Sequence, residues 1–582
     1  MFRTITRCLR EYKLPTIITI LFMTGEAVIE AIIPFITAKL VDNLSAEGGI
    51  AMNVLLRTGL ILVILTIISL CCGGAAGVTS AKAAAGLSKN VRHDIFEKVQ
   101  TFSFSNIDKF SSASLVTRLT TDINNVQMAF MMLIRIAVRA PLMLIFSITM
   151  AYIMGGKLAG TFVVVIPVLV TGLLVIAKYA MPAFRRVFKK YDRLNESIEE
   201  NVRGMRVVKG FSREDYEKKK FHAASEDICA DFTKAERIVA LNSPIMQACL
   251  YFNMSFILLV GSRIIINHES SINVGEMSSM LTYGFQILMQ LMMISMIYVM
   301  LTMSAESIKR ISEVLQEEPD IHNPENACTT VADGSISFEN VSFKYSQKAK
   351  KNALSDINVN IPSGATVGII GGTGSGKSSF VQLIPRLYDI TEGCIKVGGI
   401  DVREYDLNVL RDSVAMVLQK NVLFSGTISE NLRWGNPDAT EAELIEACKL
   451  SQAHDFVSAF PDGYETMIEQ GGTNVSGGQK QRLCIARALL KKPKILILDD
   501  STSAVDTKTD AFIRAGFRKF IPDTTKIIIA QRVASVQDAD MILVMDNGKV
   551  AAAGTHDELL QTSDIYREVY EQQTNGGDSD AS

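Results

Sequence analysis

Apolar residues gather in six long stretches in the first half of the chain. They cover approximately residues 15–41, 55–80, 128–154, 158–182, 245–267 and 277–303. Each stretch is near the ~20 residues that a helix needs to cross a ~30 Å hydrocarbon layer. After Pro319 the pattern changes to short β-rich runs that alternate with amphipathic helical segments. The pattern predicts a membrane domain of six helices followed by a separate α/β domain.

Positive charges set the expected orientation of these helices. They are concentrated in the N-terminal arm, in the segment 82–118 between the second and third stretches, and in the segment 185–220 between the fourth and fifth. By the positive-inside rule, both termini and both long segments are cytoplasmic. These segments are helical in pattern but too polar to span. We therefore expect helices two to five to extend beyond the membrane, with turns near Asn106–Phe110 and Ser212–Lys218 available to contact another domain.

Charged residues also occur inside two predicted spans, in pairs one helical turn apart. Glu26 and Glu30 lie in the first span, and Arg135 and Arg139 lie in the third. Because a charge that faces lipid is costly, each pair is expected to face the bundle interior or a water-filled cavity. Two interpretations stay open: a substrate or gating site, or interhelical ion pairs that fix the packing.

Composition narrows the function classes further. A chain of 582 residues is too long for a single core, and 48% hydrophobic with 21% charged residues fits an apolar and a polar part in one chain. The formal net charge of −2 gives no reason to expect nucleic acid as a partner. The nine cysteines show no metal-ligand spacing, which indicates reduced, structural residues.

The strongest chemical signal is the segment Val367–Ser379, which reads VGIIGGTGSGKSS. An apolar strand runs into glycines and then into a helix, the setting of a phosphate-binding loop. Its backbone N–H groups can surround phosphate oxygens, Lys377 can reach the β- and γ-phosphates, and the Ser378 hydroxyl can ligate Mg²⁺. The candidate ATP-binding residues here are Gly371, Gly372, Thr373, Gly374, Ser375, Gly376, Lys377, Ser378 and Ser379.

Two further segments complete a nucleotide site. The strand ILILDD ends at Asp499 and Asp500, and Asp499 is positioned to hold Mg²⁺. Between this strand and the phosphate loop, a helix opens with Ser476, Gly477, Gly478 and Gln479, which forms a second anion-binding helix N-terminus. One domain rarely needs two phosphate cradles for one nucleotide, whereas two domains that face each other head to tail would.

Together these motifs resemble those of the ATP-binding-cassette (ABC) proteins. The phosphate loop, the Ser476–Gln479 signature and the segment Ser503–Asp506 match that family's pattern. Within the resemblance, Gln419 looks like the Q-loop glutamine, which senses Mg²⁺ and contacts the membrane domain. Tyr345 looks like the aromatic residue that stacks on adenine, and the run EQGG from Glu469 is similar to the exporter-type X-loop.

The resemblance covers nearly the whole chain and is to half of a type IV ABC exporter. It implies a polytopic α-helical membrane domain with six transmembrane helices plus an α/β P-loop nucleotide-binding domain, with Mg²⁺ ligands Ser378, Gln419 and Asp499. The expected ranges are 1–318 for the membrane domain with its cytosolic extensions, 319–334 for a linker, 335–571 for the ABC domain and 572–582 for a disordered tail. Two half-transporters would enclose two ATP molecules, each between one phosphate loop and the opposite signature.

The chain departs from the family pattern at two positions in the same site. Asp500 stands where the family usually has the glutamate that polarises the attacking water, and Gln531 stands where a switch histidine is expected. Asp is one methylene shorter than Glu, and ~1 Å of misplacement can cost about 100-fold in rate. Glutamine can bond to the γ-phosphate but carries no proton or charge for transfer. This site is expected to bind ATP well and to hydrolyse it poorly.

The intact signature assigns these changes to one of two sites. Asp500 and Gln531 share a site with this chain's own Lys377, while Ser476–Gln479 would serve the partner's phosphate loop. The combination resembles the degenerate-site subunit of heterodimeric bacterial multidrug exporters. It implies a second half-transporter that has an intact catalytic Glu and switch His.

The resulting hypothesis is a subunit of an ATP-driven exporter in the cell membrane. It would move small amphipathic or hydrophobic compounds across the lipid bilayer by alternating access, with its ATP-binding domain in the cytoplasm. Two alternatives stay open: a lipid or peptide exporter, and a nucleotide-gated regulatory membrane protein.

Overall fold

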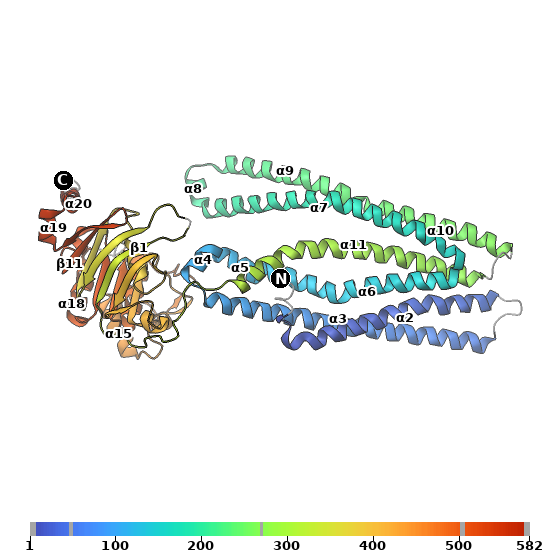
Figure 1. Cartoon of the computed structure of the whole chain (residues 1–582), viewed down its shortest axis with the longest axis horizontal. Coiled ribbons are helices and arrows are strands. Elements are labelled where there is room, and N and C mark those ends of the chain that lie inside the picture. The colour runs from blue at the N-terminus through green and yellow to red at the C-terminus, as the bar shows by residue number, and fades with distance from the viewer. Residues whose placement is uncertain (1–6, 46–50, 268–271, 348, 501–506, 576–582) are drawn as a thin grey trace. The chain divides into compact units, whose positions relative to one another are not determined.

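The computed structural model describes residues 7–45, 51–267, 272–347, 349–500 and 507–575 (Figure 1). The chain forms two compact units. A helical unit comprises Met1–Thr101 and Ser111–Glu317, and an α/β unit comprises Phe102–Phe110 and Glu318–Ser582. The short segment Phe102–Phe110 therefore belongs to the second unit, although the sequence pattern assigned it to the first.

The helical unit is built from long helices that pack side by side. Its elements are η1 (Arg10–Tyr12), α2 (Lys13–Ser45), α3 (Met52–Gln100), α5 (Ser112–Thr117), the π-helical segment η2 (Arg118–Asp122), α6 (Ile123–Gly155), η3 (Gly156–Ala159), α7 (Gly160–Arg203), α8 (Met205–Gly210), α9 (Glu214–Ala240), α10 (Asn242–Ile266) and α11 (Val274–Gln316). Figure 1 shows α3 beside α2, α6 beside α11, and α9 beside α7. The predicted turn at Ser212–Lys218 is shorter than expected, because α9 already begins at Glu214.

Six helical stretches in the described part of the chain are long and apolar enough to cross a membrane, which confirms the six predicted spans. The longest single helix, α3, has 49 residues. At 1.5 Å per residue it extends over roughly 70 Å, more than twice the ~30 Å of a hydrocarbon layer. Such helices must continue well outside any bilayer that they cross.

Close contact between α2 and α11 depends on a glycine at the start of α11. The Gly275 N–H donates to Asp42 Oδ1 at 2.6 Å. A Cβ atom at Gly275 would lie 2.0 Å from the carbonyl oxygen of Ala38. Further along α11, the buried Tyr283 hydroxyl donates to the Ala31 carbonyl oxygen at 2.7 Å. Small residues at a crossing let membrane helices approach this closely.

The charges inside the predicted spans form an interhelical cluster. Arg139 Nε on α6 lies 3.4 Å from Glu26 Oε1 on α2, and Arg139 Nη2 bonds to Glu30 Oε2. Arg135 makes no ion pair within the described ranges, and its side chain is exposed. The contacts of Arg139 support the interpretation that Glu26 and Glu30 help to fix the packing of α2 against α6.

A second polar cluster joins α11 to the segment where η2 passes into α6. Asp122 is fully buried and accepts hydrogen bonds from Arg310 Nε and Ser307 Oγ, each at 2.8 Å. Arg118 lies 3.3 Å from Glu313 Oε2. Because a buried carboxylate needs charged and hydrogen-bonding partners, these bonds fix α11 to the start of α6.

The α/β unit contains two main sheets and the helices that pack on them. Its strands are β1 (Ile336–Phe343), β2 (Leu354–Ile361), β3 (Thr366–Gly371), β4 (Glu392–Val397), β5 (Ile400–Asp401), β6 (Val414–Val417), β7 (Gly426–Thr427), β8 (Met467–Ile468), β9 (Ile495–Asp499), β10 (Thr525–Ile529), β11 (Met541–Asp546) and β12 (Lys549–Gly554). One sheet has the order β2-β1-β4-β5 and the other β12-β11-β3-β10-β9-β6, in which the neighbours from β11 to β6 are parallel.

The helices of this unit are mostly short. They are α4 (Phe104–Phe110), α12 (Lys377–Leu383), α13 (Leu407–Ser413), α14 (Ile428–Arg433), α15 (Glu441–Leu450), α16 (His454–Ser458), η4 (Gly463–Glu465), α17 (Gly477–Leu490), α18 (Thr507–Phe520), η5 (Val533–Ser535), α19 (His556–Thr562) and α20 (Asp564–Asn575). The predicted turn at Asn106–Phe110 lies within α4. Helix α20 ends at Asn575, so residues 572–575 of the expected tail are helical.

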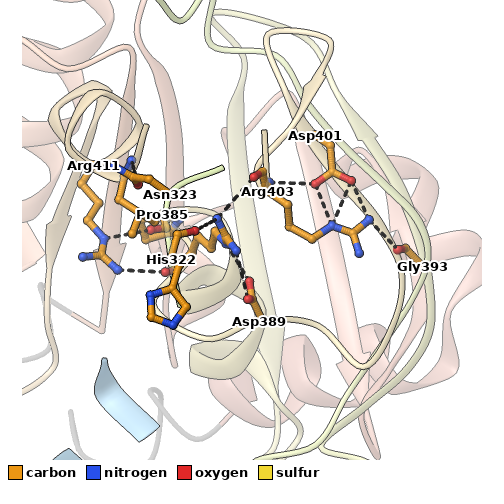
Figure 2. A network of polar contacts seen from close by, with 10 residues as sticks. His322, Asn323, Pro385, Asp389, Gly393, Asp401, Arg403 and Arg411 are labelled. Carbon is orange, nitrogen blue, oxygen red and sulfur yellow. Dashed lines mark hydrogen bonds and ion pairs between the residues drawn. The ribbon is translucent and has the colours of Figure 1, made fainter. Parts of the chain in front are cut away.

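Arginines hold the chain where it enters the α/β unit (Figure 2). Arg386 is 6% exposed, bonds to Asp389 at 2.7 Å, and donates to the His322 carbonyl oxygen at 3.3 Å. Arg411 donates to the carbonyl oxygen of Arg386 at 3.0 Å. Asn323 accepts from the Leu407 N–H at 2.9 Å. The entering segment is thus bonded to the residues that follow α12.

Candidate functional site

The site lies at the carboxyl ends of four neighbouring strands. The strands β3, β10, β9 and β6 are parallel neighbours, so their carboxyl ends meet at one edge. The phosphate loop follows β3 and Gln531 follows β10. Asp499 and Asp500 lie at the end of β9, and Gln419 follows β6. Ligands of open α/β sheets bind at this edge, and the fold brings residues together there that are far apart in the sequence.

The phosphate loop has the backbone of an anion cradle. Gly374 and Gly376 have φ angles of +82° and +98°, which side chains other than glycine rarely adopt. A Cβ atom at Gly371 would lie 2.1 Å from the Met545 carbonyl oxygen. Lys377 lies over the loop, and its Nζ donates to the carbonyl oxygens of Gly371 and Gly372, both at 2.8 Å. Burial lowers the pKa of Lys377, and the carboxylates of Asp499 and Asp500 oppose this shift.

Ser378 and Asp499 provide an oxygen pair that fits Mg²⁺. The Ser378 hydroxyl donates to Asp499 Oδ1 at 3.1 Å. Burial raises the pKa of Asp499, whereas the Ser378 hydrogen bond and Lys377 lower it. In the part of the chain that the structure describes, no group of three or more His, Cys, Asp or Glu side chains could hold a metal ion. A metal here would take Ser378 and Asp499 together with the amide oxygen of Gln419, and complete its shell with nucleotide oxygens and water.

The two residues that depart from the family pattern are bonded to each other. Gln531 Nε2 donates to Asp500 Oδ2 at 2.7 Å. Gln419 Nε2 donates to the same oxygen at 3.3 Å, so its amide nitrogen is turned toward Asp500. Asp500 has a φ of +49° and is 8% exposed, and its N–H donates to the Ile529 carbonyl oxygen at 3.1 Å. The Asp500 carboxylate is thus held by the side-chain amides of Gln531 and Gln419.

Tyr345 lies beside the phosphate-loop helix and is half-exposed. Its hydroxyl is 2.7 Å from Ser379 Oγ on α12. Its ring makes edge contacts with Phe343 at 4.8 Å and with Tyr388 at 5.2 Å between centroids. Tyr345 as a whole residue is 50% exposed, which leaves surface for a planar ligand. Tyr388 escaped the sequence analysis, because an aromatic residue after a helix carries no motif of its own.

The signature residues Ser476–Gln479 lie at the N-terminus of α17. Ser476 caps α17 and bonds reciprocally with Gln479: its hydroxyl accepts from the Gln479 N–H at 3.3 Å, and Gln479 Oε1 accepts from the Ser476 N–H at 2.9 Å. Ser476 and Gly477 are exposed. Across the described ranges, no hydrogen bond or ion pair joins Ser476–Gln479 to the phosphate loop. The segment Ser503–Asp506 lies outside the described residues.

A groove lies beside Gln419. It encloses about 360 Å³, and Leu418, Val422, Trp434 and Arg487 are among its lining residues. The Trp434 ring stacks on Phe424 with the centroids 4.2 Å apart and the planes 10° apart. Exposed aromatic rings in a concave surface are common where proteins bind each other.

Comparison with known proteins identifies the family. A model of the ABC transporter transmembrane region matches residues 16–292, and a model of the ABC transporter matches residues 354–503. The chain belongs to the ABC transporter family. This ABC transporter is 34% identical over 568 residues to the uncharacterized ABC transporter ATP-binding protein YfiB of Bacillus subtilis, with 97% of each chain covered. It is 36% identical over 544 residues to the uncharacterized protein Rv1273c of Mycobacterium tuberculosis, with 92% of each covered.

A solved structure has the same fold. A bacterial Atm1-family ABC exporter with ATP bound superposes with a TM-score of 0.82, at 23% identity, over 97% of this ABC transporter and 98% of that chain. The fold class predicted from the sequence is confirmed: a helical membrane domain with six candidate spans, followed by an α/β nucleotide-binding domain. The chain is a multi-pass membrane protein.

Proposed function

We propose that this ABC transporter is one subunit of a heterodimeric, ATP-driven exporter, and that its own ATP site binds nucleotide but hydrolyses it slowly. The observation that carries the proposal is the 2.7 Å hydrogen bond from Gln531 to Asp500. Through this bond a neutral amide holds the carboxylate at the position that usually polarises water, and that carboxylate belongs to an aspartate, one methylene shorter than the usual glutamate.

ATP binding in this proposal uses residues at the strand edge. The N–H groups of the phosphate loop and the N-terminus of α12 receive the phosphates. Lys377 would exchange its bonds to the Gly371 and Gly372 carbonyl oxygens for phosphate oxygens. Ser378, Asp499 and Gln419 would hold Mg²⁺, which screens the phosphate charge when bound. Gln419 must turn its amide oxygen toward the metal, which means breaking its 3.3 Å bond to Asp500.

Slow hydrolysis follows from the side chains at the two altered positions. Asp500 is one methylene shorter than the usual glutamate, and a shift of ~1 Å can cost about 100-fold in rate. Gln531 can donate to the γ-phosphate but cannot accept or deliver a proton at neutral pH. Its bond to Asp500 also occupies a carboxylate oxygen that a water molecule would need. These effects act on the same attacking water, so each reinforces the other.

The partner follows from the exposed signature. Ser476–Gln479 would close the partner's nucleotide site, and the partner would supply a catalytic Glu and a switch His. Turnover at that site would reset the transporter, while ATP at Lys377 keeps the two cassettes in contact. ATP-driven closure would open the membrane cavity outward, as in alternating access. The basic segments facing the cytoplasm would place both termini and the ATP-binding domain there.

The proposed cargo is a small amphipathic or hydrophobic compound. The chain's 25 methionines support an adaptable apolar surface, because the thioether side chain repacks around different shapes. A lipid or peptide exporter and a nucleotide-gated regulatory protein are the alternatives. Nucleotide-dependent conformational change without transport into vesicles would favour the regulatory protein.

The deciding experiment measures ATP hydrolysis by the purified chain in lipid, alone and with a candidate second half-transporter. We expect the chain alone to be nearly inactive, the pair to hydrolyse ATP, and Asp500→Glu to raise the rate. Lys377→Ala is the matched control, because it removes nucleotide binding at the same site. Brisk turnover by the chain alone would show that Asp500 and Gln531 suffice for catalysis, and the heterodimer proposal would then fail.

A further inference from the structure

Gln573, near the C-terminal end of α20, holds the segment of the chain that carries Gln531. Its side-chain Nε2 donates to the Gln531 carbonyl oxygen at 2.8 Å, and its Oε1 accepts from the Val533 N–H, also at 2.8 Å. A backbone carbonyl only accepts and a backbone N–H only donates, so these two partners fix which way the Gln573 amide points. One side chain thus fastens two residues of the segment that follows β10.

Gln573 lies on the face of α20 that packs against the rest of the α/β unit. Tyr566, two turns earlier, is fully buried, and its hydroxyl lies 2.7 Å from His556 Nδ1 on α19. Val569 and Tyr570 also pack against the buried core. Residues three, four and seven positions apart share one face of a helix, so Gln573 continues the face that begins at Tyr566. The helix that carries Gln573 is therefore itself fixed in place.

The segment that Gln573 holds is anchored in the core at one end and reaches the ATP site at the other. Val533 is 1% exposed and begins η5, and the first N–H groups of a helix have no carbonyl partner within that helix. Gln573 Oε1 supplies this partner. Two residues earlier, the Gln531 side chain donates to Asp500 Oδ2 at 2.7 Å. The reach of this amide depends on where its backbone lies, and Gln573 holds that backbone through the Gln531 carbonyl oxygen.

We propose that Gln573 is a positioning residue of the ATP site, and that it acts through Gln531. The inference rests on the proposed function, in which Gln531 donates to the γ-phosphate of ATP. With Gln573 in place, the Gln531 amide is held at the strand edge that would receive the phosphates. Without Gln573, the segment after β10 loses two hydrogen bonds and the Gln531 amide loses its fixed position. Because ADP has no γ-phosphate, Gln573 should matter for the binding of ATP and not for that of ADP.

The test measures the affinity of the full chain in lipid nanodiscs for the non-hydrolysable analogue AMP-PNP and for ADP, each with Mg²⁺, by calorimetric titration. Gln573→Ala should weaken AMP-PNP binding by about fivefold, as expected for one lost hydrogen bond, and leave ADP binding within about twofold. Gln572→Ala is the matched control, because the Gln572 amide bonds at 3.3 Å to Glu568 of the same helix. It should change neither affinity. A general loosening of the α/β unit would weaken the binding of both nucleotides.

Two further variants show whether the effect passes through Gln531. In a Gln531→Ala chain, adding Gln573→Ala should not change the ratio of the AMP-PNP affinity to the ADP affinity any further. Gln573→Glu keeps an acceptor for the Val533 N–H and removes the donor to the Gln531 carbonyl oxygen. It should lower the affinity ratio as Gln573→Ala does. Hydrogen exchange of a peptide over residues 530–536 should nevertheless stay slower in Gln573→Glu than in Gln573→Ala.

The outcomes distinguish this inference from the proposed function. An affinity ratio that Gln531→Ala lowers and Gln573→Ala leaves unchanged would overturn the role of Gln573 alone. An equal effect of Gln573→Ala in the wild-type and Gln531→Ala chains would overturn it as well, because the effect would then bypass Gln531. A wild-type chain that binds neither nucleotide would instead contradict the proposed ATP binding. A ratio that Gln531→Ala leaves unchanged would remove the γ-phosphate contact of Gln531, and the role of Gln573 with it.

Discussion

Gln531 donates its side-chain amide to Asp500 Oδ2 at 2.7 Å, so the two residues that depart from the usual cassette pattern form one bonded pair. The pair exists because β9 and β10 are neighbours, with Asp499 beside Ile529 in the register. Asp500 and Gln531 both lie just beyond these last paired residues. Their effects on hydrolysis should accordingly not be independent.

The double substitution Asp500→Glu with Gln531→His should restore ATP hydrolysis by more than the product of the single effects. The glutamate reaches the attacking water, and the histidine supplies a side chain that can carry a proton, which glutamine cannot. We expect each single substitution to raise the rate by clearly less than about tenfold and the double substitution by about 100-fold, which exceeds the product of the two. Phosphate release in lipid measures both. Strictly multiplicative effects would show that the two positions act separately.

Metal-dependent nucleotide binding should weaken on acidification earlier than an ordinary aspartate would predict. Burial raises the pKa of Asp499, so this ligand takes up a proton, and loses its charge, as the pH falls through a value above 3.8. The folded chain binds this proton more readily than the unfolded chain, so Asp499 itself does not destabilise the fold on acidification. Titrating Mn²⁺ at several pH values in the presence of ATP measures the effect. Asp499→Asn should bind the metal weakly and without this pH dependence.

Removing the carboxylate that holds Arg310 should destabilise the helical unit. Asp122→Ala leaves Arg310 and Ser307 without their buried acceptor, at a cost of about 3 kcal/mol. A lower Tm in nanodiscs would report it. Asp215→Ala is the control, because the Asp215–Lys218 pair is exposed and worth little. Equal Tm changes in the two variants would contradict a stabilising role for Asp122.

The crossing of α2 and α11 should not tolerate a methyl group. Gly275→Ala would place a Cβ 2.0 Å from the Ala38 carbonyl oxygen, and overpacking of this kind costs about 1–3 kcal/mol. Gly74→Ala on α3 meets nothing within 4 Å and should be neutral or slightly stabilising, because alanine favours helix. Comparing the Tm of the two variants tests whether the close approach of α2 and α11 at Gly275 is responsible for a loss of stability, or whether replacing any helical glycine has the same effect.

Much of the architecture follows from the sequence because its signals are local. Each span is a long apolar stretch, and the phosphate loop is a contiguous strand, glycine loop and helix. The bond between Gln531 and Asp500 is different, because it depends on which strands are neighbours in the sheet. Sequence identified both residues as altered but gave no means of seeing that they touch.

The assignment of α4 to the α/β unit could not be predicted for a related reason. Phe104–Phe110 is a helix of only seven residues, too short to show a helical periodicity in the sequence. Its hydrogen-bond partners Tyr388, Glu318 and Asp320 lie more than 200 residues further along the chain. The predicted linker boundary at 318–319 nevertheless lies within one residue of the division after Glu317. The apolar pattern of α11 ends there, and this change in the local sequence is what allows the boundary to be predicted.

Trp434, stacked on Phe424 beside the Gln419 segment, is the single tryptophan among 582 residues. All indole emission of this protein therefore comes from one place in the groove. A chemist who wishes to follow that surface needs no dye and need not remove any of the nine cysteines. The fluorescence of Trp434 therefore reports, without any label, when another molecule or segment binds in the groove.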